Sequence, residues 1–563
     1  MTRTATIALS ALALAALAAG AARKIPRTAL SPEQRAAHLL NRIAYGPRPG
    51  DVAAVLEQGE AAYIERQLAP EAIDDEAVET RLAGLATLQL DSRELAALFP
   101  QPGVIQRLVR DGKIDRSQFP RGARPPDKSE GEGQMQRMRG PSFDILHYQI
   151  RRLPEPIQAP GQRGRFAPKI EGVNPLPVVA AQLQAAKLIR AVESERQLLE
   201  VMTDFWFNHF NVFMGKPQAR NLVTAYERDV LRPNALGRFR DLLGAVAHSP
   251  AMQVYLDNAQ SFGADTPMGK RQGRGINENY ARELMELHTL GVDGGYTQQD
   301  VTEAARVFTG WTPAAFGFAR RGGPGSDGFL PPAHDQGEKT VLGVQFEPDG
   351  PREGEKLLDL LADNPATAQL LATKLVRRFV SDDPPQALVE QIAKTYTKTN
   401  GDIREMLRTI LYSKQFWVPE AYRSKAKKPL ELVASTVRAI GSGVEPNRQL
   451  IGTLERLGEP LYMCQPPTGY DDVAEAWLGS DQLVARWNFA LAAVLGRTPG
   501  IEADKDLLQA EGSTAERIDL LGERFWHEQP SAEARRRLLA AAEDIPDQAL
   551  AALLLGAPEF QRR

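Results

Sequence analysis

Two glutamates three residues apart, Glu283 and Glu286, are the residues of this sequence best placed to carry out chemistry. Residues at this spacing share one face of a helix. Two carboxylates on one face inside a helical bundle can hold a metal ion, or they can divide the roles of general acid and general base. Arg282, next to them, would clamp an anionic group of a substrate. We therefore predict catalytic roles for Glu283, Glu286 and Arg282.

A second candidate is the dipeptide His334-Asp335 in a glycine-rich stretch. It can bring an imidazole and a carboxylate to one site, and loops often carry functional residues. We predict that His334 is catalytic, as an acid–base group, or that it binds a metal. The predicted ligands of a divalent metal ion are Asp204, Glu283, Glu286, His334 and Asp335.

The stretch DFWFNHFNVF, residues 204–213, combines aromatic and polar side chains. On a helix, Asp204, Asn208 and Asn211 fall on one stripe, and the aromatic residues cover the rest of the circumference. A helix that is apolar on most sides is a buried helix. Its polar stripe then needs partners inside the protein, because an unpaired buried amide or carboxylate costs about 1 to 3 kcal/mol or more.

The expected partner of this stripe is the polar face of NENYARELMELHTLGVDGGY, residues 277–296. This face carries Glu278 and Asn279 together with the two glutamates. We predict a polar network that contains Asn208, Asn211, Glu278 and Asn279. The alternative remains open that the face is solvated and is stabilised by pairs of glutamate and arginine.

Two histidines, His209 and His288, project among apolar residues and away from the polar stripes. A histidine in such surroundings is most often a core residue with its hydrogen bonds satisfied. If these histidines are functional, they would bind a cofactor such as noncovalent haem in an aromatic pocket. Cys464 is the only cysteine, which excludes an intramolecular disulfide, a cysteine-based zinc cluster and covalent C-x-x-C-H haem attachment.

The elements that must position these residues are helices, because helical periodicity dominates the chain and strand alternation is almost absent. We predict an all-α fold, a multi-helix globular bundle with long Gly/Pro-rich loop insertions and at most a short β-hairpin at HDQGEKTVLG (334–343). The predicted insertions are 112–142, 154–175 and 313–353. The helical core is predicted at 31–500, with C-terminal helices at 501–563 packed on it.

Two helix starts can be predicted from capping residues. Ser194 with Gln197, and Thr297 with Asp300, have the spacing of a capping box ahead of helical segments.

The N-terminal segment predicts export. Arg3 precedes an apolar run at 7–19 and the small residues 20–22, the layout of a signal peptide. We predict a signal peptide at 1–22 and a mature chain without a transmembrane span, in the periplasm in preference to the extracellular space. The formal net charge of -3 argues against nucleic acid as a partner.

Several long motifs resemble one bacterial protein family. They are SERQLLEVMTDFWFNHFNVF (194–213), YERDVLRPNALGRFRDLL (226–243), NENYARELMELHTLGVDGGYTQQDVTEAARVFTGWT (277–312), HDQGEKTVLG and EPLYMCQPPTGYDDVAEAW (459–477). On these motifs the chain is similar to domain of unknown function 1800, from about His38 to Trp487. The resemblance implies a bacterial, commonly exported and mostly helical protein, and it implies no reaction. It also implies a neighbour, the co-exported family domain of unknown function 1501, which is similar to alkaline phosphatases and sulfatases, as a candidate partner.

Two hypotheses of function follow. The first is an exported protein with an internal polar, metal-binding pocket that acts as an enzyme on an envelope or extracellular substrate. The second is a non-catalytic accessory or structural protein that binds a co-exported partner and whose polar network only specifies its core.

Overall fold

The structure is a computed structural model, and it describes residues 29–563 except 102–104, 106–109, 113–176, 314–327 and 543–544. The predicted signal peptide, the predicted insertion 154–175, nearly all of the insertion 112–142 and residues 314–327 of the third insertion lie outside the described residues.

The described residues confirm the predicted all-α class. The first helices are α2 (Pro32–Ile43), α3 (Asp51–Gln58), α4 (Glu60–Leu68), α5 (Glu76–Ala83) and α6 (Ser92–Leu98). The long helices α8 (Pro177–Glu193) and α9 (Gln197–His209) follow. Next come α10 (Val223–Ala225), the π-helix η8 (Tyr226–Leu231), α11 (Arg232–Asn234), α12 (Phe239–His248), α13 (Pro250–Tyr255), α14 (Pro267–Gln272), α15 (Asn279–Glu283), the π-helix η10 (Leu284–Thr289) and α16 (Gln298–Val307).

The second half of the chain is also helical. It contains α17 (Pro351–Ala362), α18 (Pro365–Phe379), α19 (Gln386–Thr399), α20 (Ile403–Leu411), α21 (Lys414–Trp417), α22 (Pro429–Ala439), α23 (Arg448–Arg456), α24 (Ser480–Val494), α25 (Lys505–Leu508), α26 (Thr514–Trp526), α27 (Ala532–Ala541), α28 (Asp547–Gly556) and α29 (Pro558–Gln561). Short 3₁₀ turns are η2 (Pro70–Ala72), η3 (Ala86–Gln89), η9 (Asn258–Gln260), η12 (Pro331–Ala333) and η13 (Ala474–Ala476).

The predicted hairpin is present. Strand β1 (Lys339–Val341) pairs antiparallel with β2 (Val344–Phe346), and Thr340 lies opposite Gln345. The two turn residues, Leu342 and Gly343, both have positive φ angles, of 50° and 75°. Two such residues in a row suit the right-handed twist of a tight hairpin.

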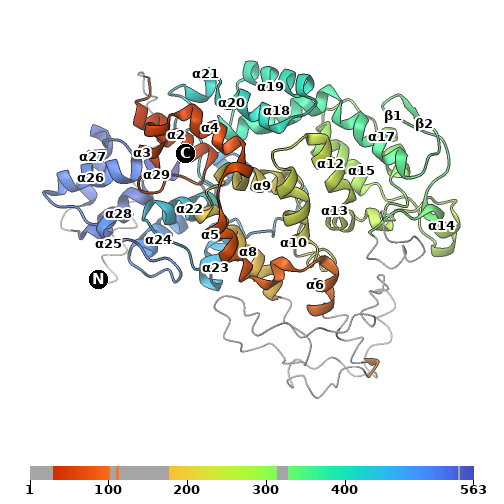
Figure 1. Cartoon of the computed structure of the whole chain (residues 1–563), viewed down its shortest axis with the longest axis horizontal. Helices are drawn as coiled ribbons and strands as arrows, with labels where there is room; N and C mark the ends of the chain where they lie inside the picture. Colours follow the sequence, from red (N-terminus) through yellow and green to blue (C-terminus); the bar gives the residue numbers. More distant parts are fainter. Residues whose placement is uncertain (1–28, 102–104, 106–109, 113–176, 314–327, 543–544) are drawn as a thin grey trace.

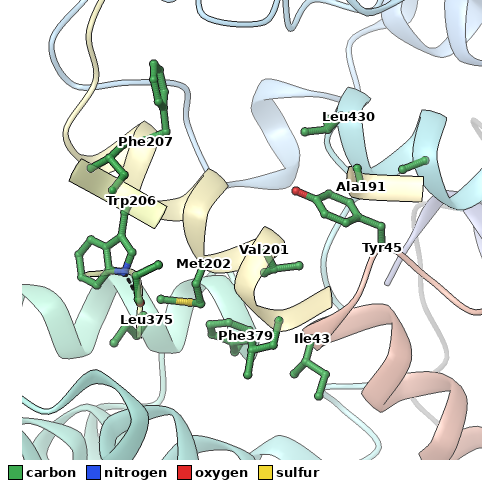
Figure 2. Packing of buried hydrophobic residues seen from close by; sticks show 14 of the residues in the cluster. Ile43, Tyr45, Ala191, Val201, Met202, Trp206, Phe207, Leu375, Phe379 and Leu430 are labelled. Carbon is green, nitrogen blue, oxygen red and sulfur yellow. Dashed lines mark hydrogen bonds between the residues drawn. The ribbon is translucent and has the colours of Figure 1, made fainter. Parts of the chain in front are cut away.

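Helix α9 lies near the middle of the molecule, between the C-terminal helices α24 to α29 at one end and the hairpin at the other (Figure 1). It packs against α2, α4, α8 and η8. Figure 2 shows Val201, Met202 and Trp206 of α9 facing Leu375 and Phe379 of α18. One buried apolar cluster runs from α2 to α29 and includes the aromatic side chains of α9. The predicted burial of this helix is therefore confirmed.

The end of α9 was predicted wrongly, because the helix stops at His209 and does not continue to residue 213. Past this point the chain pairs with the segment 459–470. The Asn211 amide donates to the carbonyls of Cys464 and Pro466, and the Met214 N–H donates to the Tyr462 carbonyl. These tertiary hydrogen bonds replace the ones that another helical turn would have made.

One of the two predicted capping boxes is confirmed. The Thr297 hydroxyl accepts from the Asp300 N–H, and the Asp300 carboxylate accepts from the Thr297 N–H. The box at Ser194 is wrong, because α9 begins after Arg196 without a side-chain cap. The Ser194 hydroxyl donates to Asp75 and accepts from the Arg196 N–H, and the Gln197 amide donates to the Ser194 carbonyl at 2.8 Å instead of to its N–H.

No helix among the described residues has both the length and the apolar character needed to cross a membrane.

Candidate functional site

Five buried charged residues surround the polar stripe of α9. We call them the Asp204 cluster: Lys187 on α8, Asp204 on α9, Glu227 on η8, Lys428 at the start of α22, and Glu459 after α23. Their side chains are between 5% and 14% exposed. Charges buried to this degree are tolerated only when they are paired.

The two lysines link the three carboxylates of the Asp204 cluster in a chain. Lys187 Nζ lies 3.0 Å from Asp204 Oδ1 and 3.2 Å from Glu227 Oε2. Lys428 Nζ lies 3.3 Å from Asp204 Oδ2 and 3.6 Å from Glu459 Oε1. The Tyr462 hydroxyl donates to Glu227 Oε2 at 2.9 Å. Two arginines add positive charge next to the cluster, because Arg378 interacts with Asp204 and Arg232 interacts with Glu227.

Glu459 is the carboxyl group of the cluster whose pKa is raised. Burial raises its pKa to about 6; Lys428 acts against this shift, and the negative charge of Asp204 adds to it. Burial alone would raise the pKa of Asp204 too, but Lys187 and Lys428 outweigh burial and hold this pKa well below its usual range. Asp204 and Glu459 share Lys428, yet the pKa of one is lowered and the pKa of the other is raised. Two carboxyl groups with pKa values shifted apart are typical of a paired acid and base.

A small cavity of about 30 Å³ lies beside the Asp204 cluster. Its lining also includes Asn208, Asn211, Cys464 and Tyr470. This volume accommodates about one or two water molecules. A larger substrate would need the wall of the cavity to move.

The two predicted asparagines hold one wall of this cavity. Asn208 donates to the Tyr470 carbonyl at 2.8 Å and accepts from the Tyr470 N–H at 2.7 Å. Asn211 donates to the carbonyls of Cys464 and Pro466 at 2.9 and 2.7 Å. Asn208 on α9 and Asn211 just past its end therefore fix the segment 464–470.

The predicted catalytic glutamates occupy a different place. Glu283 ends α15, Glu286 lies in η10, and both side chains are partly exposed. Burial, and next the charge of Glu286, raise the pKa of Glu283. The π-helical turn of η10 widens the helix, so the arrangement of faces expected for a regular α-helix does not hold beyond Glu283.

The rest of that polar face pairs with α16. Arg282 donates to Glu278 and Gln298, each at 3.0 Å, and Thr302 donates to Glu278 at 2.7 Å. Asn279 donates to the Leu256 carbonyl at 3.3 Å. This arrangement matches the alternative of a partly solvated face with a glutamate–arginine pair.

Tyr255 is the residue that lies between the two polar regions. Its hydroxyl donates to the Gln465 carbonyl at 2.7 Å. Burial raises its pKa, with smaller contributions from Cys464 and from Glu283. Glu283 is therefore close enough to Tyr255 for its charge to act on that hydroxyl, while Tyr255 contacts the segment 464–470.

The two predicted cofactor-binding histidines do meet. His209 Nε2 lies 3.1 Å from the main-chain carbonyl of His288, and Lys374 Nζ lies 3.0 Å from His209 Nδ1. Burial, and then the charge of Lys374, lower the pKa of His209 well below its usual range and that of His288 to about 3. Both rings are neutral at physiological pH, and Phe210 packs against both of them.

The third predicted region, His334-Asp335, lies beside the hairpin. His334 is fully buried, with Nε2 at 2.8 Å from Glu353 Oε1 and Nδ1 at 2.8 Å from the Thr309 carbonyl. Asp335 accepts two hydrogen bonds from Arg306, each of 3.0 Å. The contact between His334 and Glu353 ties this loop to α17.

The predicted metal ligands therefore fall into three separate places. Among the residues that the structure describes, no group of three or more His, Cys, Asp or Glu side chains is arranged to hold a metal ion. Metal and haem binding stay predictions.

Four members of the site were not among the predicted site residues: Lys187, Glu227, Lys428 and Glu459. Lys187 carried a usable signal, because it lies in the mostly apolar stretch AAQLQAAKLIRAV (180–192), with Leu183 and Ala191 as neighbours four residues away on the helix. A charge on an apolar face indicates a buried ion pair. The pairing of Lys428 with Glu459 had no local signal.

The comparisons with known proteins concern the whole chain. The family model described as "Protein of unknown function (DUF1800)" matches residues 38–562. This match extends past Trp487, where the resemblance described above was expected to end, and it includes the C-terminal helices. Comparison with curated proteins and with solved structures gave no match. The chain belongs to the DUF1800 family.

Proposed function

We propose that the protein is an exported enzyme whose acid–base centre is the Asp204 cluster. The observation that carries this proposal is that Asp204 and Glu459 both contact Lys428, while their pKa values are shifted in opposite directions. The pKa of Glu459 is raised to about 6, so its carboxyl group can exchange a proton close to neutral pH, while Asp204 stays ionised beside Lys187 and Lys428. Such a pair can transfer a proton and stabilise the charge that the transfer creates.

In this proposal the ionised form of Glu459 takes a proton from a water molecule in the adjoining cavity, and the resulting hydroxide attacks the substrate. The attacked bond then breaks, and Glu459 returns its proton to the leaving group, which restores the ionised form. Lys428 contacts both carboxylates and compensates the change in charge. The reaction class is attack by water on a small polar group of an envelope substrate, the substrate entering when the 464–470 wall moves. Asn208 and Asn211 are positioning residues, because they hold that wall.

A non-catalytic role is the second candidate, and one observation favours it. The charged groups of the cluster use one another as partners, and the cavity of about 30 Å³ is far smaller than the roughly 300 Å³ or more of a usual ligand site. The cluster would then specify how α8, α9 and α22 pack. The protein would act by binding a co-exported partner, for which the DUF1501 family is the candidate, in the periplasm.

The deciding experiment compares purified wild type with Glu459→Gln and with Glu455→Gln. Glu455 is an exposed residue on α23, close in sequence, and serves as the control. Each protein is incubated with periplasmic and envelope extract, and small molecules are compared by mass spectrometry. The enzyme proposal predicts products formed by wild type and Glu455→Gln that are lost with a folded Glu459→Gln. Identical profiles for all three proteins would contradict it and favour the accessory role.

A further inference from the structure

An open cleft of about 620 Å³ lies on the surface where α9, η8, α11, α12 and α20 come together. Its volume is in the range of ligand pockets, about 300 to 1,000 Å³. Five arginines line this cleft: Arg196, Arg228, Arg232, Arg238 and Arg404. Arg228, Arg232 and Arg238 come from one stretch of the chain, 228–238, and the fold brings Arg196 and Arg404 next to them. We call this the arginine cleft.

Three of these guanidinium groups are held in place by the protein. Arg232 makes two hydrogen bonds to the buried Glu200 carboxylate, of 2.6 and 2.8 Å. Arg404 makes two bonds of 3.1 Å to Glu71. Arg228 donates to the carbonyl of Leu90 at 3.0 Å. Groups fixed in this way lose little side-chain entropy when a ligand binds.

The other two arginines retain hydrogen-bond donors. Arg196 uses Nε to bind the Ile73 carbonyl at 2.9 Å. Within the described residues, the structure shows no further hydrogen bond from its guanidinium group and none from that of Arg238. Arg238 is exposed. Since guanidinium N–H groups match the oxygen atoms of phosphate and carboxylate, these two side chains are available for an anion.

Two helices also begin at the arginine cleft. Arg196 immediately precedes α9 and Arg238 immediately precedes α12, and neither helix has a side-chain cap at its N-terminus. The positive end of a helix dipole adds to the attraction for an anion. Several donors that approach from different elements suit a tetrahedral group, which has more oxygen atoms to share among them than a carboxylate has.

The other residues that line the arginine cleft indicate which chemical groups the rest of the ligand would carry. Leu199 and Leu236 offer apolar contact, and Asp241 and Asp402 can accept hydrogen bonds from hydroxyl groups. From this geometry we infer that the arginine cleft binds a small phosphate ester with a hydroxylated body, such as a sugar phosphate. The phosphate group contacts Arg196 and Arg238. This site is separate from the Asp204 cluster, and its test does not depend on the proposed function.

The experiment is isothermal titration calorimetry of the full mature chain with ribose 5-phosphate, inorganic phosphate and citrate. The variants are Arg238→Gln and the double variant Arg196→Gln/Arg238→Gln. Arg536→Gln is the control, because Arg536 is an exposed arginine on α27 and does not line the cleft. Thermal unfolding followed by circular dichroism establishes that each variant is folded. Arg238 is exposed, so its single variant decides the test if the double variant unfolds.

The expected result is binding of ribose 5-phosphate that Arg238→Gln weakens about tenfold or more and that Arg536→Gln leaves unchanged, since a lost charge-assisted hydrogen bond has about this effect. Inorganic phosphate should bind more weakly at the same site. The proposal is overturned if neither phosphate binds, if Arg238→Gln binds like wild type, or if Arg536→Gln weakens binding equally. Tighter binding of citrate than of ribose 5-phosphate would overturn the assignment to phosphate esters.

Discussion

Asp204 has two lysine partners, and this contact should dominate the stability contributed by the cluster. Asp204→Asn keeps the shape but removes the charge that faces Lys187 and Lys428. Removal of one partner from a buried ion pair costs about 3 to 5 kcal/mol. We expect a loss of this size in the free energy of unfolding, measured by urea denaturation.

The control for that substitution is Asp229→Asn. Asp229 also pairs with an arginine, Arg228, but its side chain is 52% exposed. Exposed pairs contribute about 1 kcal/mol or less. Equal losses for the two variants would show that burial does not determine the energetics of Asp204.

Glu459 should make stability depend on pH in a definite direction. Its folded-state pKa is raised from 4.5 to about 6, so the folded state binds the proton more tightly than the unfolded state. The resulting stabilisation is complete below about pH 4.5 and is lost as the pH rises through about 6. Its size is about 2 kcal/mol.

The measurement for Glu459 is urea denaturation between about pH 4 and 7. As the pH rises over this range, wild type and Glu455→Gln should each lose about 2 kcal/mol more stability than Glu459→Gln loses. The same pH dependence in Glu459→Gln would assign the titration to another group.

The sequence allowed only part of the site to be predicted at the scale of residues. The stripe of Asp204, Asn208 and Asn211 was expected to need buried polar partners, and it has them. The partners are Lys187, Lys428 and the main chain of 464–470, instead of the face at 277–296. Periodicity identifies which side of a helix is buried, but it carries no information about which distant segment covers that side. The catalytic roles predicted for Arg282, Glu283, Glu286 and His334 stay predictions.

At the scale of elements, the segment 464–470 depends on one close approach to α9. Gly469 has φ of 74°, and a Cβ atom there would lie 2.2 Å from the Asn208 carbonyl oxygen. We predict that Gly469→Ala destabilises the protein by about 3 kcal/mol or more, because it adds a clash to the strain of the left-handed conformation.

Gly496→Ala is the matched control for Gly469→Ala. Gly496 also has a positive φ, of 63°, but a Cβ atom there would meet open space. Strain alone should cost about 1 kcal/mol. Thermal unfolding of the two variants separates the effect of the clash with Asn208 from the effect of backbone strain. Equal shifts in melting temperature would contradict the close approach of Gly469 to Asn208.

Elements with local signals were predictable, and those set by tertiary contacts were not. The hairpin at 339–346 and the cap at Thr297 follow from short-range residue preferences. The end of α9 at His209 depends on hydrogen bonds to residues more than 240 positions away, such as that from Asn211 to the Cys464 carbonyl. The π-helical turns η8 and η10 also lack a sequence pattern that separates them from α-helix.

At the scale of the whole molecule, the C-terminal helices share the apolar cluster of the rest. Leu554 on α28 is fully buried in this cluster. Leu554→Ala should cost about 2 to 5 kcal/mol and lower the melting temperature of the whole chain in one transition. Leu539→Ala on α27 is the control, because Leu539 is 37% exposed. Calorimetry that shows a separate early transition with Leu554→Ala would mean that 501–563 unfolds independently.

The all-α class was predictable from periodicity alone, since helical spacing recurs along most of the chain. The relative placement of the helices was not predictable, because it depends on contacts such as those between α18 and α9 in Figure 2. Knowing that the fold is all-α therefore does not tell where a site lies, because its position depends on long-range contacts.

The central claim is that Glu459 titrates near pH 6 inside the Asp204 cluster. Infrared difference spectroscopy over about pH 5 to 7 detects protonated carboxyl groups directly. We predict a protonated-carboxyl band in wild type that disappears with a midpoint near pH 6 and is absent from Glu459→Gln. A wild-type spectrum without such a band, or a band of equal size in Glu459→Gln, would contradict the claim.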